Sequence, residues 1–520
     1  MSDDRLRFET DPSRYRHWKL EINGSIATLA MAVDPAGGLR DDYELKLNSY
    51  DLSVDIELHD ALQRLRFEHP TVKAIVITGG LDKVFCAGAN IQMLATSTHA
   101  HKVGFCKFTN ETRNGIEEMS AEGGQVAIAA VNGTAAGGGY ELALACDEIL
   151  LVDDRSSAVS LPEVPLLAVL PGTGGLTRVV DKRHVRRDLA DVFSTKVEGI
   201  KGKQAVEWGL VDAIAPPTAF ADLVRTRALA RAAESDRPDD AEGFELRPLE
   251  HRFVEVVRTE TAATVTVRAF GSLEESLEAC RELDDAILDL RFNDADLGTW
   301  VLRTEGDASA VLAADEELDR GDWLAREVRL YWKRTLKRLD MSARTLVALV
   351  TPGSCFAGTL AELALAADRT LMLDDDETVL QLTDVNDGWY LMANGISRLA
   401  TRFWGRDDSL ARVRSLLGKQ LPAGDAFDVG LVTSAPDDLD WDDEVRILLE
   451  ERASFSPDAL TAMEANLRFP GPETMETKIF ARLTAWQNWI FQRPNAVGPD
   501  GALKRYGTGV RPAFDKGRVG

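Results

Sequence analysis

The stretch VAIAAVNGTAAGGGYELALACDEILLVDD, from Val126 to Asp154, decides the fold of this chain. Its first six residues, 126–131, are apolar and predict a buried strand, which the Asn-Gly pair at 132–133 ends. Gly137–Gly139 then precede a helical composition, and EILLV (148–152) predicts the next buried strand. Glycines remove Cβ atoms where a helix starts, and the first N–H groups of a helix lack helical partners. Such N–H groups suit an anion or an oxygen atom that gains negative charge.

The glycine run alone is also compatible with a plain tight turn. Its spacing matches neither G-x-G-x-x-G with a distant acid nor G-x-x-x-x-G-K-[ST], which disfavours a dinucleotide site and a P-loop. Upstream, KAIVITGG (73–80) predicts a buried strand leading into VFCAGANIQML (84–94), where small residues again precede a helical pattern. Downstream, SLPEVPLLAVLPGTGGLTRVV (160–180) places Glu163 after a proline. Two turns able to donate N–H groups, and the carboxylates of Glu141 and Glu163, therefore lie close together along the chain.

Three of these segments together resemble a known superfamily. FCAGANI, AAVNGTAAGGGYELALACD and LPEVPLLAVLPGTGG are similar, in order and spacing, to the signature segments of the crotonase (enoyl-CoA hydratase/isomerase) superfamily. The resemblance implies an α/β fold with a crotonase-like ββα spiral core and an acyl-CoA thioester as substrate. It also implies an oxyanion hole whose backbone donors are Ala89 and Gly138, with Glu141 and Glu163 as the acid/base carboxylates. Further substrate-binding positions implied by it are Gly88, Gly137 and Gly139.

The chemistry implied by the resemblance agrees with these residue types. A thioester carbonyl that turns toward an enolate gathers negative charge on oxygen, and two fixed N–H donors stabilise that charge by about 3 kcal/mol or more. Paired carboxylates can activate a water molecule and transfer a proton. Either glutamate alone would more simply be a solvated or capping carboxylate. Asn90 is a departure, since the family often has Asp there; the turn is retained but a charge beside it is lost.

Composition limits the remaining possibilities. With 520 residues and 45% hydrophobic content, the chain is expected to form two to three globular domains. It has no run of eighteen apolar residues and a polar beginning, so we expect a cytoplasmic protein without a membrane span. A net charge of −25 disfavours nucleic acid and anionic membranes as partners, and CoA would need a local basic patch. Five cysteines without C-x-x-C, and histidines without H-E-x-x-H, suggest neither a disulfide framework nor a metal site.

The chain also contains an internal repeat. ELALAADRTLMLDDD (362–376) repeats ELALACDEILLVDDR (141–155) without a gap, so that Glu362 corresponds to Glu141. The same constant offset equates Gly138 with Thr359, Glu163 with Asp384 and Gly174 with Gly395, and FCAGANI has no clear match in the second copy. We therefore expect a duplicated fold whose second copy has lost its chemistry and serves as a scaffold.

The repeat and the linker-like segment PDDAEGFELRP lead to a domain prediction. We expect a catalytic domain over 1–237, a linker over 238–248, a degenerate second domain over 249–455, and a helical C-terminal segment with a tail over 456–520. Residues 1 to about 22 are expected to form an N-terminal arm. Within the C-terminal segment, Trp486, Trp489 and Ile490 share a helix face, which predicts core packing or a subunit interface rather than a ligand site. The Gly-rich tail could fold back over the site or fray.

A closer resemblance covers nearly the whole chain. The segments KLNSYDLSVDIELHDALQRLRFEHP and HKVGFCKFTNETRNGIEEMS, the degenerate copy and the ALKRYG tail are similar to the benzoyl-CoA-dihydrodiol lyases. This resemblance implies opening of 2,3-epoxy-2,3-dihydrobenzoyl-CoA with two waters, giving 3,4-didehydroadipyl-CoA semialdehyde and formate. It implies no cofactor beyond the coenzyme A of the substrate, and it adds Cys106 as a catalytic candidate, whose simpler interpretation is a buried small hydrophobe. We expect a homodimer, since the fused copy can replace a subunit contact.

Two alternatives stay open at the level of sequence. A general enoyl-CoA hydratase or isomerase shares every motif between Val84 and Gly175, but it does not explain the second copy or Cys106. A non-catalytic acyl-CoA-binding scaffold would suit the second copy, but it does not explain the intact glutamate pair. Hydration of crotonyl-CoA by the purified protein would distinguish these alternatives.

Overall fold

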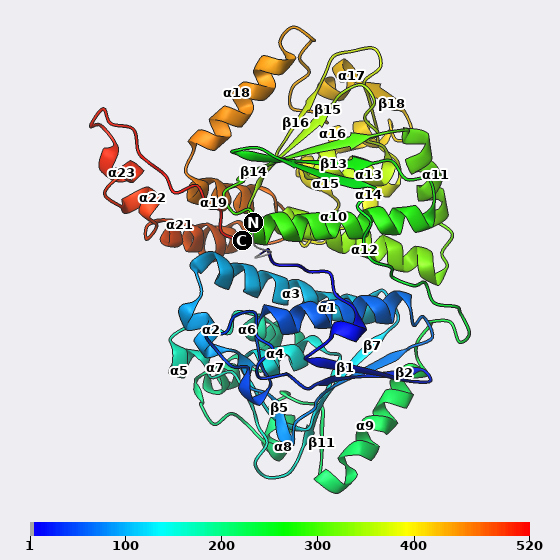
Figure 1. The fold of residues 1–520 in the computed structure, drawn as a ribbon, viewed down its shortest axis with the longest axis vertical. Coiled ribbons are helices and arrows are strands. Elements are labelled where there is room, and N and C mark those ends of the chain that lie inside the picture. The colour runs from blue at the N-terminus through cyan, green and yellow to red at the C-terminus, as the bar shows by residue number, and fades with distance from the viewer. Residues whose placement is uncertain (1–4) are drawn as a thin grey trace. The chain divides into compact units, whose positions relative to one another are not determined.

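The computed structural model describes residues 5–520, which divide into two compact units (Figure 1). The first unit is Arg7–Pro248. The second is Leu249–Gly520, and Arg5 and Leu6 belong to it. In the described part of the chain, none of the helices is long and apolar enough to cross a membrane.

The first unit is built on a six-stranded sheet. An N-terminal antiparallel hairpin lies at one edge, and the other four strands are all parallel, as the alternation of strand and helix signals predicts. The order is β1 (Trp18–Asn23), β2 (Ile26–Met31), β4 (Ala74–Gly79), β7 (Val126–Val131), β9 (Glu148–Val152) and β11 (Ala213–Ala215).

The expectation of an N-terminal arm reaching to about residue 22 is partly wrong. Trp18 already pairs with Met31, so the end of the supposed arm is an edge strand. Its sequence, WKLEIN, lacks the long apolar run of a buried strand because most of its residues are exposed on the edge of the sheet. Gly24, with φ of +61°, makes the tight turn to β2.

Helices cover both faces of this sheet. Alternate strand residues, such as Val76, Ile128 and Leu150, pack against α9 (Pro217–Ala232) on one face. The intervening residues face the helices of the other side, α1 (Leu52–Phe67) and α3 (His99–Ala121) (Figure 1). Both faces are therefore buried, which explains why β4, β7 and β9 appear in the sequence as continuous apolar runs.

Two short sheets of the first unit hold the turns identified in the sequence. One has the order β10 (Val159–Ser160), β8 (Gly133–Ala136) and β5 (Lys83–Cys86). The other pairs β3 (Ser49–Tyr50) with β6 (Gly88–Ala89). A short helix follows each turn, α2 (Ile91–Thr96) after the first and α4 (Gly138–Ala145) after the second, and a third short helix, α5 (Glu163–Leu167), follows the proline.

The second unit repeats the strand order of the first. An antiparallel hairpin again leads into parallel strands, and α13 (Gly358–Ala366) precedes the last strand as α4 precedes β9. The sheet order is β12 (Val254–Arg258), β13 (Ala262–Arg268), β14 (Thr299–Glu305), β15 (Thr345–Val350) and β16 (Arg369–Met372). Its helices include α10 (Leu273–Asn293), α11 (Ala308–Leu318), α12 (Trp323–Met341) and α18 (Trp441–Ser454). The duplicated α/β fold is thus confirmed.

Backbone geometry supports the repeat register that equates Glu141 with Glu362. Gly174 and Gly395, which the same register equates, both have a left-handed backbone, with φ of +89° and +79°. Glu163 begins α5, and its counterpart Asp384 directly precedes α14 (Val385–Gly388). The register therefore extends beyond the segments whose letters agree.

Residues 238–248, expected as a linker, are tied to the first unit. The Phe244 N–H donates to the Phe67 carbonyl at 2.7 Å, and the Leu246 N–H donates to the Glu68 carboxylate at 3.0 Å. These bonds hold the segment against the end of α1. The domain boundaries themselves stay a prediction.

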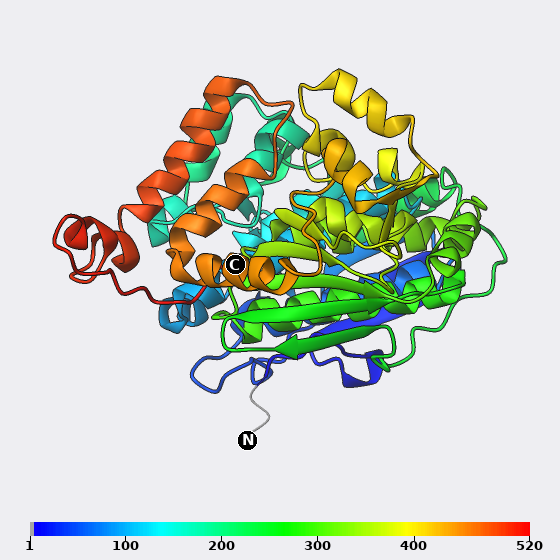
Figure 2. The ribbon, with the colours of Figure 1, turned by 90° about the horizontal axis from the view of Figure 1, so that it is seen from above.

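The C-terminal segment of the second unit is helical, and Figure 1 and Figure 2 show it in orange and red. Trp486 and Trp489 make an edge-to-face contact with ring centroids 5.5 Å apart. No residue of α21 (Thr484–Ile490) is buried, so core packing of this aromatic stripe, one of the two expectations, is wrong. The subunit-interface alternative stays a prediction. The remaining helical turns here are α19 (Pro457–Leu467), α20 (Met475–Thr477), η4 (Lys478–Leu483), α22 (Pro494–Val497) and α23 (Ala502–Arg505).

Candidate active site

The first predicted oxyanion donor lies on the short strand β6. Tyr50 pairs with Ala89, and the Asn90 N–H donates to the Tyr50 carbonyl at 2.8 Å. Successive N–H groups of a strand point to opposite sides, so the Ala89 N–H points away from β3. Asn90 then caps α2, because its Oδ1 accepts the Met93 N–H at 2.9 Å. Its Nδ2 donates to the Glu44 carbonyl at 2.8 Å, a bond that an Asp could not make.

The second predicted donor, Gly138, is the first residue of α4. The preceding Gly137 has φ of +53°, which favours glycine, and its N–H donates to the Ser160 carbonyl at 2.9 Å. A Cβ on Gly88 would lie 3.0 Å from the Gly138 nitrogen, which shows that the two turns touch. The structure therefore brings the two predicted donors together from separate segments of the chain, as a pair of backbone donors requires.

Gly138 must lack a side chain because Tyr50 occupies the space beside it. A Cβ built on Gly138 would overlap the Tyr50 hydroxyl oxygen. Tyr50 is almost completely buried, so its ring cannot move aside into solvent. This close approach explains the middle glycine of the run.

Glu141 is a buried carboxylate whose oxygens are held by three donors. Oε1 accepts the Thr173 N–H at 3.0 Å and the Gly175 N–H at 2.8 Å, and Oε2 accepts the Thr173 hydroxyl. The turn after α5 thus holds the Glu141 carboxylate in one orientation.

Glu163 lies in a different environment. A Cβ on Gly137 would lie 2.6 Å from its Oε1, so the carboxylate rests against the glycine turn beside Gly138. Its Oε2 is buried and has no hydrogen-bond partner among residues 5–520. Burial, with the Glu141 charge as a second cause, raises the pKa of Glu163 to about 7. The two carboxylates therefore differ in their surroundings, since Glu141 accepts three hydrogen bonds and the Glu163 Oε2 accepts none from the described residues.

Cys106 on α3 reaches the same site. Its Sγ lies 3.6 Å from the position of a Cβ on Gly172, in the turn that holds Glu141. Burial, and then the Glu141 charge, raise the pKa of the Cys106 thiol to about 11. The sulfur is therefore a neutral thiol near pH 7 rather than a thiolate.

Three further residues of the site were not identified from the sequence. Thr173 holds Glu141, and Tyr50 and Arg113 lie behind the glycine turn. Arg113 lies on the buried face of α3, together with Phe105, Thr109 and others. A charged residue on an apolar helix face is the signal that would have identified it, since lone buried charges are rare.

The corresponding place in the second unit is filled by its own side chains. The Thr359 N–H, at the position equated with Gly138, donates to Asp315 Oδ2 at 2.9 Å. Glu362, equated with Glu141, is paired with Arg398 at 2.9 Å, and it also accepts from Asn386 at 2.8 Å. The site geometry of the first unit is therefore not reproduced in the second.

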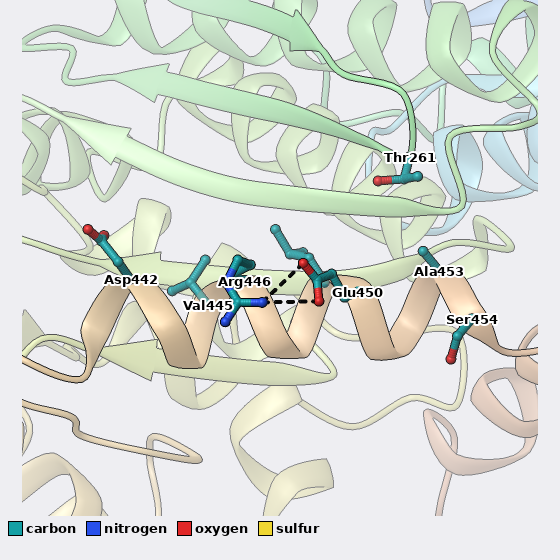
Figure 3. Close-up of a pocket in the computed structure, with 8 residues that line it drawn as sticks. Thr261, Asp442, Val445, Arg446, Glu450, Ala453 and Ser454 are labelled. Carbon is teal, nitrogen blue, oxygen red and sulfur yellow. Dashed lines mark hydrogen bonds and ion pairs between the residues drawn. The ribbon is translucent and has the colours of Figure 1, made fainter.

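One pocket of the second unit lies away from this place. It has a volume of about 690 Å³ and follows one side of α18, where Arg446 pairs with Glu450 at 3.2 Å (Figure 3). It contains none of the predicted site residues. Within residues 5–520, no three His, Cys, Asp or Glu side chains are grouped closely enough to hold a metal ion.

Known proteins are similar to this chain over segments much longer than the candidate site. The enoyl-CoA hydratase/isomerase family model matches residues 44–239. Benzoyl-CoA-dihydrodiol lyase from Aromatoleum evansii is 56% identical over 541 aligned positions, which cover 98% of each chain. The fatty acid oxidation complex subunit alpha of Idiomarina loihiensis is 31% identical over 193 residues, covering 37% of this chain and 26% of that protein. Among solved structures, enoyl-CoA hydratase from Bacillus anthracis is 25% identical, covers 42% of this chain and 77% of its own, and has a TM-score of 0.36.

These matches differ in what they cover. The family model and the fatty acid oxidation subunit correspond to only part of the chain, and the model ends within the first unit, which holds both turns and both glutamates. The lyase from Aromatoleum evansii matches both units along nearly their whole length. The chain therefore belongs to the benzoyl-CoA-dihydrodiol lyase family, a branch of the enoyl-CoA hydratase/isomerase superfamily.

Proposed function

We propose that this protein opens the oxygenated ring of a benzoyl-CoA derivative. The substrate is 2,3-epoxy-2,3-dihydrobenzoyl-CoA, which with two waters gives 3,4-didehydroadipyl-CoA semialdehyde and formate. One observation carries the proposal: two carboxylates with different surroundings, Glu141 and Glu163, lie beside a contact between two backbone turns, in a chain 56% identical to a benzoyl-CoA-dihydrodiol lyase. In this proposal the present protein is a carbon–carbon lyase that acts on a CoA thioester.

In this proposal the two turns bind the thioester oxygen. The N–H groups of Ala89 and Gly138 donate to it, and they stabilise the negative charge that it gains when electrons from the breaking C–C bond move toward the carbonyl. Gly88 and Gly137 let the backbone approach the thioester closely, because neither has a side chain in the way. Gly139 continues the bare first turn of α4.

The glutamates divide the proton transfers. Glu141, held in one orientation by Thr173 and Gly175, orients and deprotonates an attacking water. Glu163, with a pKa of about 7, carries a proton at or below neutral pH and delivers it to the opening ring. Cys106 contributes a neutral thiol that can donate a hydrogen bond to the substrate from the Gly172 side.

The proposed reaction needs no redox cofactor, because water addition and C–C bond cleavage use no external oxidant or reductant. The coenzyme A of the substrate is therefore the only carrier that the reaction needs. We further propose a homodimer in the cytoplasm. Light scattering that returned a monomer or a hexamer would contradict the dimer.

Product analysis tests the function directly. The purified protein is supplied with enzymatically made 2,3-epoxybenzoyl-CoA, and the products are identified by mass spectrometry. Formate together with a six-carbon semialdehyde-CoA is the expected result. Unchanged substrate, with rapid hydration of crotonyl-CoA instead, would return the chain to the general hydratases. Unchanged substrate without hydration would favour a binding scaffold.

A further inference from the structure

We propose that Arg113 and Tyr50 are positioning residues of the oxyanion site. They set the distance between its two turns and keep a buried positive charge behind the Gly138 donor. The inference rests on the proposed function, in which a thioester oxygen binds between Ala89 and Gly138. Arg113 is buried and takes no part in the proton transfers proposed above, so another role is needed to explain it.

Tyr50 connects the two turns by two different routes. Its main chain pairs with Ala89, and its carbonyl accepts the Asn90 N–H at 2.8 Å. Its side chain reaches across to the other turn, where the hydroxyl lies against the Cα of Gly138. One residue therefore touches both predicted donors, so its placement determines their separation.

Arg113 holds the end of this tyrosine. Its Nη2 donates to the Tyr50 hydroxyl at 3.0 Å and to the Gly138 carbonyl at 3.1 Å, and its Nη1 donates to the Thr109 carbonyl at 3.3 Å. The guanidinium also lies over the Tyr50 ring, 5.5 Å from the centroid. The planar guanidinium of Arg113 thus joins the Tyr50 side chain to the Gly138 turn. A lysine could not reproduce all of these hydrogen bonds.

The charge of Arg113 is only loosely balanced. The nearest carboxylate oxygen, of Asp55, is 3.8 Å away, and that carboxylate also accepts the Thr109 hydroxyl. Arg113 is 1% exposed, and its Nε has no hydrogen-bond partner in the described chain. Burying a guanidinium this way costs stability, because one neighbouring carboxylate at this distance does not replace water. A positive charge retained at such a cost, next to the first turn of α4, favours an oxygen that gains negative charge there.

The second unit shows the opposite arrangement at the equivalent turn. There the first-turn N–H of Thr359 is capped by the Asp315 carboxylate, and the Thr359 hydroxyl also contacts the Tyr390 hydroxyl at 2.9 Å. The Asp315 carboxylate therefore occupies the N–H donor of the second unit. In the first unit the equivalent residue, Gly138, is instead contacted through its carbonyl by the Arg113 guanidinium, which suits a turn whose N–H receives an external oxygen.

The test measures the absorption spectrum of a thioester bound to the protein. Cinnamoyl-CoA absorbs at longer wavelength than protein or adenine, and hydrogen bonds to its thioester oxygen shift this absorption further to the red. The probe is bound in a Glu163→Gln background so that it is not consumed. In that background Arg113→Met and Tyr50→Phe are expected to lose most of the shift, and Arg113→Lys is expected to recover part of it.

Turnover gives the second readout. In otherwise unchanged enzyme, Arg113→Met is expected to lower kcat at least about tenfold with a smaller change in KM, because the lost effect acts on charge that develops during reaction. The matched control is Arg66→Met, which removes another buried arginine of the first unit, one that donates to the Gly115 carbonyl at 2.6 Å. This control is expected to lower Tm but to keep both kcat and the spectral shift.

Each outcome has a definite meaning. Equal kcat and equal red shift in Arg113→Met and Arg66→Met would overturn the inference and leave Arg113 a structural residue. If Arg113→Met does not fold, an unchanged shift in Tyr50→Phe and Arg113→Lys would overturn it equally. No red shift in the parent Glu163→Gln protein, despite binding of the probe, would instead refute the oxyanion site of the proposed function.

Discussion

The backbone N–H of Thr359 donates a 2.9 Å hydrogen bond to the Asp315 carboxylate, at the turn equivalent to the one that begins at Gly138. A Cβ on the preceding Gly358 would overlap that same carboxylate. An internal carboxyl group thus accepts the N–H at the position equivalent to Gly138, which is the proposed oxyanion donor of the first unit. The second unit has kept the helix and the glycine turn but has closed the donor site.

This closure predicts a single substrate site in each chain. Isothermal titration of the Glu163→Gln protein with a slowly reacting acyl-CoA is expected to give one bound ligand per chain, since Asp315 blocks the second turn. Two ligands per chain would contradict this. Gly137→Val is the control, because its side chain would enter the space of the Glu163 carboxylate and is expected to abolish binding.

Removal of Asp315 should destabilise the protein. Asp315→Ala leaves the buried Thr359 N–H without an acceptor, which costs about 1–3 kcal/mol for an unsatisfied group, and it leaves the Thr359 hydroxyl with Tyr390 as its partner. Asp315→Asn keeps an acceptor and is the matched control. Urea unfolding measures both, and equal stability of the two variants would show that the carboxylate has no capping role.

Asp315 should also make stability depend on pH. Burial raises the pKa of Asp315 to about 7, above its ordinary value of 3.8. For a raised folded-state pKa, the contribution to stability is fully present below about pH 4 and is lost as pH rises toward 7. Asp315→Asn is expected to flatten this part of the stability profile, and an unchanged profile would place the titration on another group.

The pKa of Glu163 gives a prediction for activity. Because Glu163 acts as the proton donor and its pKa is about 7, kcat/KM should fall as pH rises through 7. Glu163→Gln is expected to turn over at least about a hundredfold slower and to lose that inflection. A normal rate in this variant, with the inflection retained, would remove Glu163 from the mechanism.

Thr173 should matter through Glu141 alone. Thr173→Val removes the hydroxyl that donates to Glu141 Oε2 and leaves the backbone donor in place. Turnover is expected to fall about tenfold, with little change in KM, because one of the three hydrogen bonds that orient Glu141 is lost. Thr173→Ser is the control and should behave as wild type; equally slow turnover in both variants would indicate a packing effect instead.

Cys106 should act as a thiol and not as a nucleophile. With a pKa of about 11 it is almost entirely protonated near neutral pH, so iodoacetamide should modify it slowly even where the reagent can reach it. Cys106→Ala is expected to lose turnover while keeping affinity, and Cys106→Ser should retain part of the turnover. Wild-type turnover in Cys106→Ala would end its catalytic assignment.

Local patterns in the sequence determined much of the fold. Apolar runs such as 126–131 predicted the parallel strands, because a strand buried on both faces needs no polar alternation. The gap-free repeat of the segment after Glu141 predicted the duplication, and the structure confirms it through Gly174 and Gly395, which have the same left-handed backbone. The glycine turns marked the position of the candidate site, since only a bare backbone fits there.

Only the tertiary structure decided the electrostatics of the site. The raised pKa of Glu163 depends on burial and on the charge of Glu141, and neither can be seen from a glutamate after a proline. Tyr50 and Arg113 meet Gly138 from two other segments of the chain, and Asp315 meets Thr359 from a different helix. Hydrophobic periodicity and glycine turns are local properties that a sequence displays directly. Contacts between buried polar groups depend instead on which segments the folded core brings together, so they become visible only in three dimensions.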